Sequence, residues 1–192
     1  MATTVGDLTK LGLNPGNIYW APLGTAITDP TPVASKLPVL GAPWVALGYT
    51  DEGFSWSYAI GTENVEVAEL LDPAAVITTS RTITATFSLA QINNANLKYA
   101  LNGGTITATG TGATALSKLE APALGAEVRA MIAWQSTDDT ERLILKQVLQ
   151  SGEVSIARRK GAAKALIPFT MTAEAPADGS SPFVSYTSGA RG

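Results

Sequence analysis

The sequence predicts a mainly β protein, an antiparallel β-sandwich or barrel with one flanking α-helix. Two runs, Phe54–Ile60 and Arg81–Leu89, alternate between apolar and small polar side chains, which is the period-two signature of a strand. The period changes clearly to helical spacing only once, over residues 89–101. Turn-forming residues separate most of the remaining short runs, so an antiparallel arrangement is expected.

The first 43 residues predict little regular structure. Residues 1–16 mix Thr, Gly, Asp and Lys and end at a turn signal, Asn14-Pro15-Gly16, so we expect an N-terminal arm. A short strand is expected at Asn17–Ala21. Residues 22–43 are rich in Pro and lack periodicity, which predicts a long excursion over a surface of this subunit or of a neighbour. A strand candidate follows at Val45–Tyr49.

A long hairpin is expected over residues 51–72. A tight turn at Asp51-Glu52-Gly53 opens it, and the alternating runs Phe54–Ile60 and Glu63–Leu70 supply its two strands. The turn between them is expected near Gly61-Thr62.

Arg81–Leu89 is the clearest strand, with four apolar side chains on one face and hydroxyls on the other. Ser88 and Gln91 have the spacing of a capping box, so we expect a helix over residues 89–101. Asn102-Gly103-Gly104 supplies its C-terminal stop.

The later part of the chain predicts further strands. They are expected at Thr105–Thr109, Val128–Gln135, Arg142–Leu149, Val154–Ala157 and Ala165–Thr172. Arg142–Leu149 also contains good helix formers, but the short Asp138-Asp139 turn favours a strand. One domain is therefore expected over residues 17–175, followed by a C-terminal arm, residues 176–192, rich in Gly, Ser and Pro.

Composition excludes several classes of function. The chain has no Cys and no His, which excludes disulfides, Cys/His zinc sites and His-based catalytic triads. Net charge is −3, which argues against a surface built to grip nucleic acid. No run approaches a membrane span of about 20 apolar residues, so we expect cytoplasmic synthesis and no membrane partner. We expect no cofactor and no metal.

Charge is low and segregated. Charged residues make up 15 %, against about 25 % in an ordinary soluble domain, which fits a protein that buries much of its surface on partners. Residues 37–80 carry only acids, and residues 154–173 carry only bases. The acids are Asp51, Glu52, Glu63, Glu66, Glu69 and Asp72, and the bases are Arg158, Arg159, Lys160 and Lys164. Two solvated faces would explain this, and so would complementary patches that stack copies head to tail.

Three motifs resemble chemical sites. Gly110–Ala115 fits G-x-G-x-x-A but lacks a following helix, so it is interpreted as a glycine-rich turn. The acids between Glu63 and Glu69 contain no isolated pair for glycoside chemistry. Arg158-Arg159-Lys160 could contact phosphate but more often marks a solvated turn or an ion-pairing partner for the acidic hairpin.

Each of the four tryptophans has two interpretations, core anchor or interface hot spot. Trp56, on an alternating strand, predicts core or inter-subunit packing. Trp44, after the Pro-rich excursion, is the best interface candidate.

Residues 44–104 resemble the major tail tube proteins of siphophages, especially those that infect actinobacteria. The resemblance lies in the opening Trp44-Val-Ala-Leu-Gly-Tyr-Thr-Asp-Glu-Gly53, the hairpin, and the strand and Asn- and Leu-rich helix that run from Arg81 to Gly104. It implies a β-sandwich tube fold with one flanking helix, and no enzymatic activity. Six subunits would form a ring whose inner sheets join into one β-barrel.

The resemblance also implies partners and a location. Rings would stack along a tape-measure protein, with tail terminator and tail tip proteins at the ends, in a virion with a long non-contractile tail. DNA would pass through the lumen without specific binding. The hairpin would contact the next ring, and its acids would line the lumen or the seam between rings.

Other function classes stay open at this point. A tail terminator or head decoration protein would share the composition and the lack of catalytic residues. A carbohydrate-binding β-sandwich would place its tryptophans in an exposed line. An enzyme would need a buried acid pair.

Overall fold

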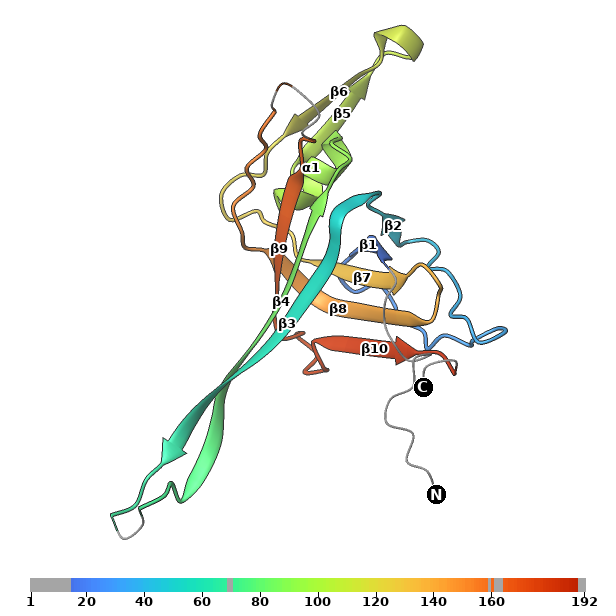
Figure 1. Cartoon of the computed structure of the whole chain (residues 1–192). Coiled ribbons are helices and arrows are strands. Elements are labelled where there is room, and N and C mark those ends of the chain that lie inside the picture. The colour runs from blue at the N-terminus through green and yellow to red at the C-terminus, as the bar shows by residue number, and fades with distance from the viewer. Residues whose placement is uncertain (1–14, 69–70, 159, 161–163, 190–192) are drawn as a thin grey trace.

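A computed structural model describes residues 15–68, 71–158, 160 and 164–189. Among these residues, eight strands form one antiparallel sheet in the order β2-β1-β7-β8-β9-β4-β3, with β10 paired to β8 (Figure 1). β5 and β6 form a separate two-stranded sheet. The elements are β1 (Gly16–Pro22), β2 (Val45–Ala46), β3 (Thr50–Val65), β4 (Ala75–Leu89), α1 (Asn94–Ala100), β5 (Thr105–Thr109), the 3₁₀ turn η2 (Gly112–Thr114), β6 (Leu116–Glu120), β7 (Ala130–Ser136), β8 (Glu141–Gln150), β9 (Ile167–Ala173) and β10 (Phe183–Thr187). The predicted fold class, mainly β with one α-helix, is confirmed.

Strand β8 joins the two halves of the sheet. On one edge it pairs with β7. On the other edge its first half pairs with β10, from Glu141 to Leu145, and its last residues pair with β9, from Val148 to Gln150. The sheet therefore divides at β8, and its two branches fold toward each other.

The main core lies between the two branches. The rings of Phe87 and Phe169, on neighbouring strands, stack with centroids 4.7 Å apart. Phe54 of β3 reaches across to Trp134 of β7, at 6.0 Å. Leu89 and Ile167 are fully buried beside them. This is the period-two apolar face that the sequence predicted for Arg81–Leu89, with each aromatic side chain removing a large apolar area from water.

The Pro-rich segment covers a second cluster on the opposite face of β1, β7 and β8. Ile27, Leu40 and Trp44 pack there against Tyr19, Met131 and other buried side chains. The buried Arg142 guanidinium donates to the carbonyl of Pro38 and to Gln135 Oε1, which fixes the segment to the sheet. Residues 22–43 thus lie over this subunit's own sheet.

The long hairpin differs from the prediction. Phe54–Ile60 and Glu63–Val65 belong to one strand, β3, which pairs along its length with β4. The turn expected at Gly61-Thr62 is wrong, because the pairing only shifts register there. The turn expected at Asp51–Gly53 is also wrong, since these residues lie within β3 at a second irregularity. Small residues in a strand mark bulges as well as turns, and here they mark bulges.

The helix is shorter than expected. It spans Asn94–Ala100, and its N-cap is Asn93, whose side chain accepts from the Asn96 backbone N–H. The capping box at Ser88–Gln91 is therefore wrong, because pairing with β9 keeps Ser88 and Leu89 in strand β4. The stop at Asn102–Gly104 is confirmed by the positive φ angles of these residues.

The later strands are largely as predicted. Arg142–Leu149 is a strand, and the Asp138-Asp139 turn joins it to β7. Val154–Ala157 is not a strand, although Val154 and Ile156 pack against the core. Strand β6 was not predicted. Residues 176–192, expected as an arm, contain β10, which pairs with β8.

Candidate assembly surfaces

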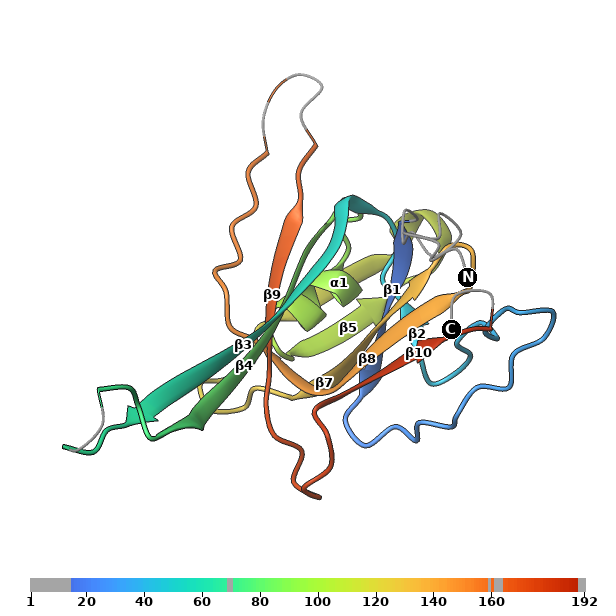
Figure 2. The ribbon, with the colours of Figure 1, turned by 60° about the horizontal axis from the view of Figure 1, so that its bottom comes forward.

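The far half of the β3–β4 hairpin projects away from the sheet (Figures 1 and 2). Its apolar side chains have no core to enter. Leu71 is fully exposed, at 106 %, and Val76 is 62 % exposed. Val65, Val67 and Ile77 are also exposed. Large exposed apolar patches on a soluble chain mark contact sites, so this tip is a candidate interface.

The six acids do not form one cluster. Glu63, Glu66 and Asp72 are exposed at the far end of the hairpin, and we call these three the acidic tip. Asp51 and Glu52 lie at the other end of β3. Twelve strand residues at about 3.3 Å each separate Asp51 from Glu63 by roughly 40 Å. Glu69 lies outside the described residues.

The basic residues lie in the connection between β8 and β9. We call residues 154–166 the basic segment; its described bases are Arg158, Lys160 and Lys164, all exposed. Arg159 lies outside the described residues. Lys164 Nζ forms an ion pair with Asp51 Oδ1 of β3. One predicted acid and one predicted base thus meet within the same chain.

The acidic tip and the basic segment lie on separate projections of the molecule, far from each other. In Figure 1 the orange strand β9 and the chain leading into it rise at the upper left, while the hairpin ends at the lower left. In Figure 2, turned by 60°, the hairpin ends at the lower left and the chain leading into β9 rises at the top, so the two are well separated in both views. The subunit therefore carries unlike charge on two separated projections.

The four tryptophans have different environments. Trp20 stacks on Tyr99 of α1 at 4.3 Å, and Trp134 stacks on Phe54. Trp44 is half-buried in the cluster beneath the Pro-rich segment. Trp56 is 45 % exposed and lies 5.7 Å from Phe183 of β10. Of the two predicted interface aromatics, Trp56 has the more open surface.

Strand β3 forms one edge of the sheet. It is the last strand in the order of the sheet, and no described strand pairs with its outer edge along the 16 residues of β3. A row of free backbone N–H and C=O groups of this length is a template for pairing with another chain. Sequence reasoning missed the length of this edge because it divided β3 at Gly61-Thr62.

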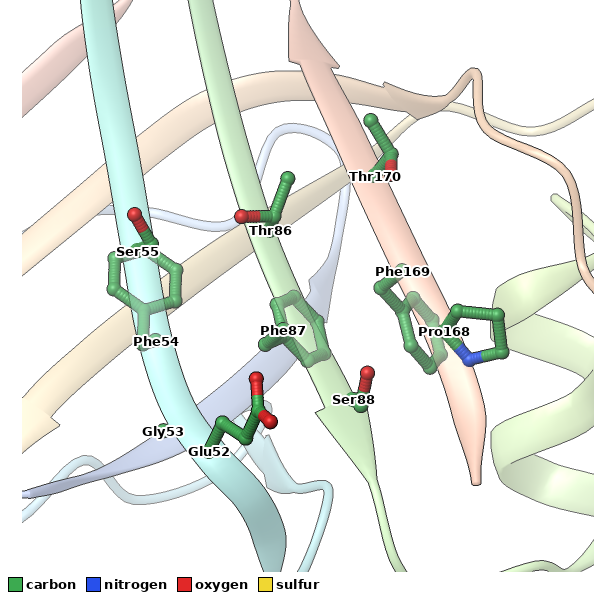
Figure 3. A pocket seen from close by; sticks show the side chains of 10 residues that line it. All are labelled: Glu52, Gly53, Phe54, Ser55, Thr86, Phe87, Ser88, Pro168, Phe169 and Thr170. Atoms are coloured by element: carbon green, nitrogen blue, oxygen red, sulfur yellow. The ribbon is translucent and has the colours of Figure 1, made fainter. Parts of the chain in front are cut away.

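A shallow pocket of about 330 Å³ lies on the outer face of β3, β4 and β9 (Figure 3). Ser55, Thr86 and Thr170 lie in a row across the three strands, and Glu52 lies apart from this row, next to Gly53. No group of three potential metal ligands occurs among the described residues. The pocket offers hydroxyls and one carboxylate but no paired acids, so it has no evident catalytic chemistry.

Comparison with known proteins decides the class. The phage tail tube protein family matches residues 14–188, which is nearly the whole chain. The chain belongs to the phage tail tube protein family.

Membership of the tail tube family makes this a structural component of the virion and not an enzyme. Proteins of this family assemble with copies of themselves and with other tail proteins into a tube. No curated protein matches the chain. Among the described residues, no helix is both long and apolar enough to cross a membrane.

Proposed function

We propose that this tail tube protein forms hexameric rings that stack head to tail into the tube of a long non-contractile tail, through which DNA is ejected. The observation that carries the proposal is the hairpin. Its far half projects from the domain, exposes apolar and acidic side chains, and lies far from the basic segment. A subunit with two unlike, complementary ends makes heterologous contacts, which generate open filaments.

The axial contact of this proposal joins the acidic tip of one ring to the basic segment of the next. Arg158 and Lys160 are exposed bases of the basic segment, whereas Lys164 already pairs with Asp51 within the subunit. Complementary charge sets register and rejects wrong pairings, and the exposed Leu71 and Val76 add apolar area. Glu69 and Arg159 belong to the same two segments of the chain.

The lateral contact uses the outer edge of β3. Pairing this edge with a neighbouring subunit satisfies backbone groups that would otherwise face water, and it closes a ring only if six rotations return to the start. Trp56, Tyr58 and Ile60, half-exposed along the same strand, supply apolar area beside this joint. Trp44, beneath the Pro-rich segment, is the second aromatic candidate at a subunit contact.

The other proteins with which the tube would assemble are proposed from the resemblance to siphophage tubes. They are a tape-measure protein inside the growing tube, and terminator and tip proteins at its ends. DNA would pass without specific binding.

Assembly of the purified full chain tests the proposal. Concentrated protein imaged by negative stain should show tubes with a regular axial repeat and six-fold end views. Protein that remains monomeric, or that stops at discrete trimers, at every concentration would contradict stacked hexamers.

A further inference from the structure

The face of strands β3, β4 and β9 that points away from the core of the subunit carries rows of hydroxyl side chains. Ser57, Thr84 and Thr172 are paired across the three strands, and so are Ser55, Thr86 and Thr170. We call this surface the hydroxyl face; it comprises Ser55, Ser57, Thr82, Thr84, Thr86, Ser88, Thr170 and Thr172. Ser151, just after β8, extends it through a hydrogen bond of 2.7 Å between its Oγ and Thr172 Oγ1.

The same three strands bury their other face. Ile83, Ala85 and Phe87 of β4 and Phe169 and Met171 of β9 are at most 5 % exposed. The residues of the hydroxyl face alternate with them and are exposed or half-exposed. The orientation of the hydroxyl face is therefore fixed by the core.

No described residue of the hydroxyl face is charged. Arg81 of β4 pairs with Ile60 and so lies on the other face. Glu52 lies at one end of the hydroxyl face. At the other end Glu174 is bound by the Arg129 guanidinium, at 3.1 Å, and by Gln147. An ordinary solvent-facing sheet of this size carries Lys and Glu, which also protect it from aggregation.

We infer that the hydroxyl face lines the lumen of the tube, as an uncharged, water-holding wall past which a nucleic acid duplex slides. This rests on the proposed function, and it names the lining residues. The acids at the hairpin end are then ring-to-ring contacts and not the lumen wall.

Physical chemistry favours hydroxyls for such a wall. A ring repeats every side chain, so one Lys per subunit would become a belt of cations that holds phosphate through counterion release. Apolar side chains would favour dewetting of a constricted channel. Ser and Thr hydroxyls keep water at the wall and bind phosphate only weakly. Threonine is also a good strand former, so the wall does not weaken the sheet.

Single cysteines test the assignment on a clean background, because the natural chain has none. We would make Ser57→Cys, Thr84→Cys and Thr86→Cys, each a small change on an open surface. Assembled tubes are treated with a small maleimide, or with a maleimide coupled to a globular protein too wide to enter the tube. Dissociated subunits treated in the same way are the control, and both reagents should label them.

In tubes, the expected result is labelling by the small reagent and loss of labelling by the bulky one. Labelling by both would place the hydroxyl face on the outer wall, and labelling by neither would bury it between subunits; either result overturns the inference while the tubes themselves uphold the proposed function. Electron cryo-microscopy of wild-type tubes gives the same answer if a cysteine variant fails to assemble. Absence of wild-type tubes would overturn both proposals.

Discussion

Lys164, in the basic segment, forms an ion pair with Asp51 at the start of β3. The two residues are 113 positions apart in the chain. The pair fixes the end of the basic segment to the sheet, and it removes one charge of each sign from those available to a neighbouring subunit. The lysine side chain is 62 % exposed, so the pair itself adds little stability. Its main effect is to leave Arg158 and Lys160 as the described bases of the basic segment that can contact a neighbouring subunit.

Charge reversal tests the axial contact. Glu63→Lys with Glu66→Lys should stop elongation, because two bases would then face Arg158 and Lys160 of the next ring. Arg158→Glu with Lys160→Glu should have the same effect. Combining all four changes should restore tubes, since the complementary pairing is only inverted. Tube length by electron microscopy is the measurement.

The control for charge reversal is Lys36→Glu, an exposed base in the Pro-rich segment. It should leave tube length unchanged. Failure of the four-fold variant to assemble, with its fold intact by circular dichroism, would count against direct pairing of the two ends. Tubes of the wild type should also shorten at high salt, because the screening length between exposed charges falls from about 10 Å at 0.1 M salt to about 3 Å at 1 M.

The apolar part of the hairpin tip makes a separate prediction. Val67→Ser with Leu71→Ser should leave the melting temperature of the subunit nearly unchanged, because neither side chain enters the core. Assembly should need a higher protein concentration, since about 1.5–3 kcal/mol of burial is lost for each large side chain. Val33→Ser with Val39→Ser, which are also exposed but lie in the Pro-rich segment, is the control. Equal critical concentrations for the two pairs would contradict a contact at the tip.

If the hydroxyl face lines the lumen, a charge placed on it should determine whether tubes retain DNA. Thr84→Lys should make tubes retain a short fluorescent duplex at low salt, whereas wild-type tubes and Thr84→Gln tubes should not. Retention should fall steeply with salt, with a logarithmic slope of about −0.9 for each phosphate that is neutralised. Co-sedimentation over a salt series measures this. Retention by Thr84→Gln equal to that by Thr84→Lys would exclude the electrostatic explanation.

Strand β10 predicts the effect of truncation. Phe183 contacts Trp56 and Tyr58, and β10 covers one edge of β8. Ending the chain after Glu174 should therefore destabilise the subunit by several kcal/mol, beyond the roughly 2–5 kcal/mol of losing one large core side chain. Ending it after Gly189 keeps β10 and should have little effect. Urea denaturation followed by tryptophan fluorescence measures both, and equal midpoints would show that residues 176–189 behave as a dispensable arm.

Glu174 links subunit stability to pH. Its pKa is lowered, first by the hydrogen bond from Arg129 and then by the one from Gln147. A carboxyl with a lowered folded-state pKa stabilises the fold above its unfolded pKa, and this stability is lost as pH falls through the folded pKa. Glu174→Gln should therefore reduce stability at neutral pH, by about 1 kcal/mol or less for a partly exposed pair, and flatten its acid dependence. Urea denaturation over a pH series measures this. If the free energies of unfolding of wild type and variant fall in parallel as the pH is lowered, Glu174 does not have this role.

Much of the fold could be predicted from local pattern. Arg81–Leu89 alternates so regularly that its buried face was evident, and Asn102–Gly104 marked the end of the helix. The capping box at Ser88 failed because local capping competes with strand pairing, and the pairing of Leu89 with Ile167 is invisible in sequence. The turn at Gly61-Thr62 failed for the same reason, since a bulge and a turn use the same small residues.

The site was predictable only in part. The segregation of acids and bases along the chain pointed to two patches, but β3 carries Asp51 roughly 40 Å from Glu63. Only three-dimensional pairing shows that Asp51 belongs with Lys164. The hydroxyls of β4 were noted as one side of a strand. Their continuation onto Thr170 and Thr172 depends on pairing with β9, whose residues come more than 80 positions later in the chain.

Electron cryo-microscopy of tubes formed by the wild-type chain tests head-to-tail stacking most directly. The density should place Glu63, Glu66 and Asp72 of one ring against Arg158 and Lys160 of the next. Tubes in which the hairpin points outward, without touching an adjacent ring, would contradict the account.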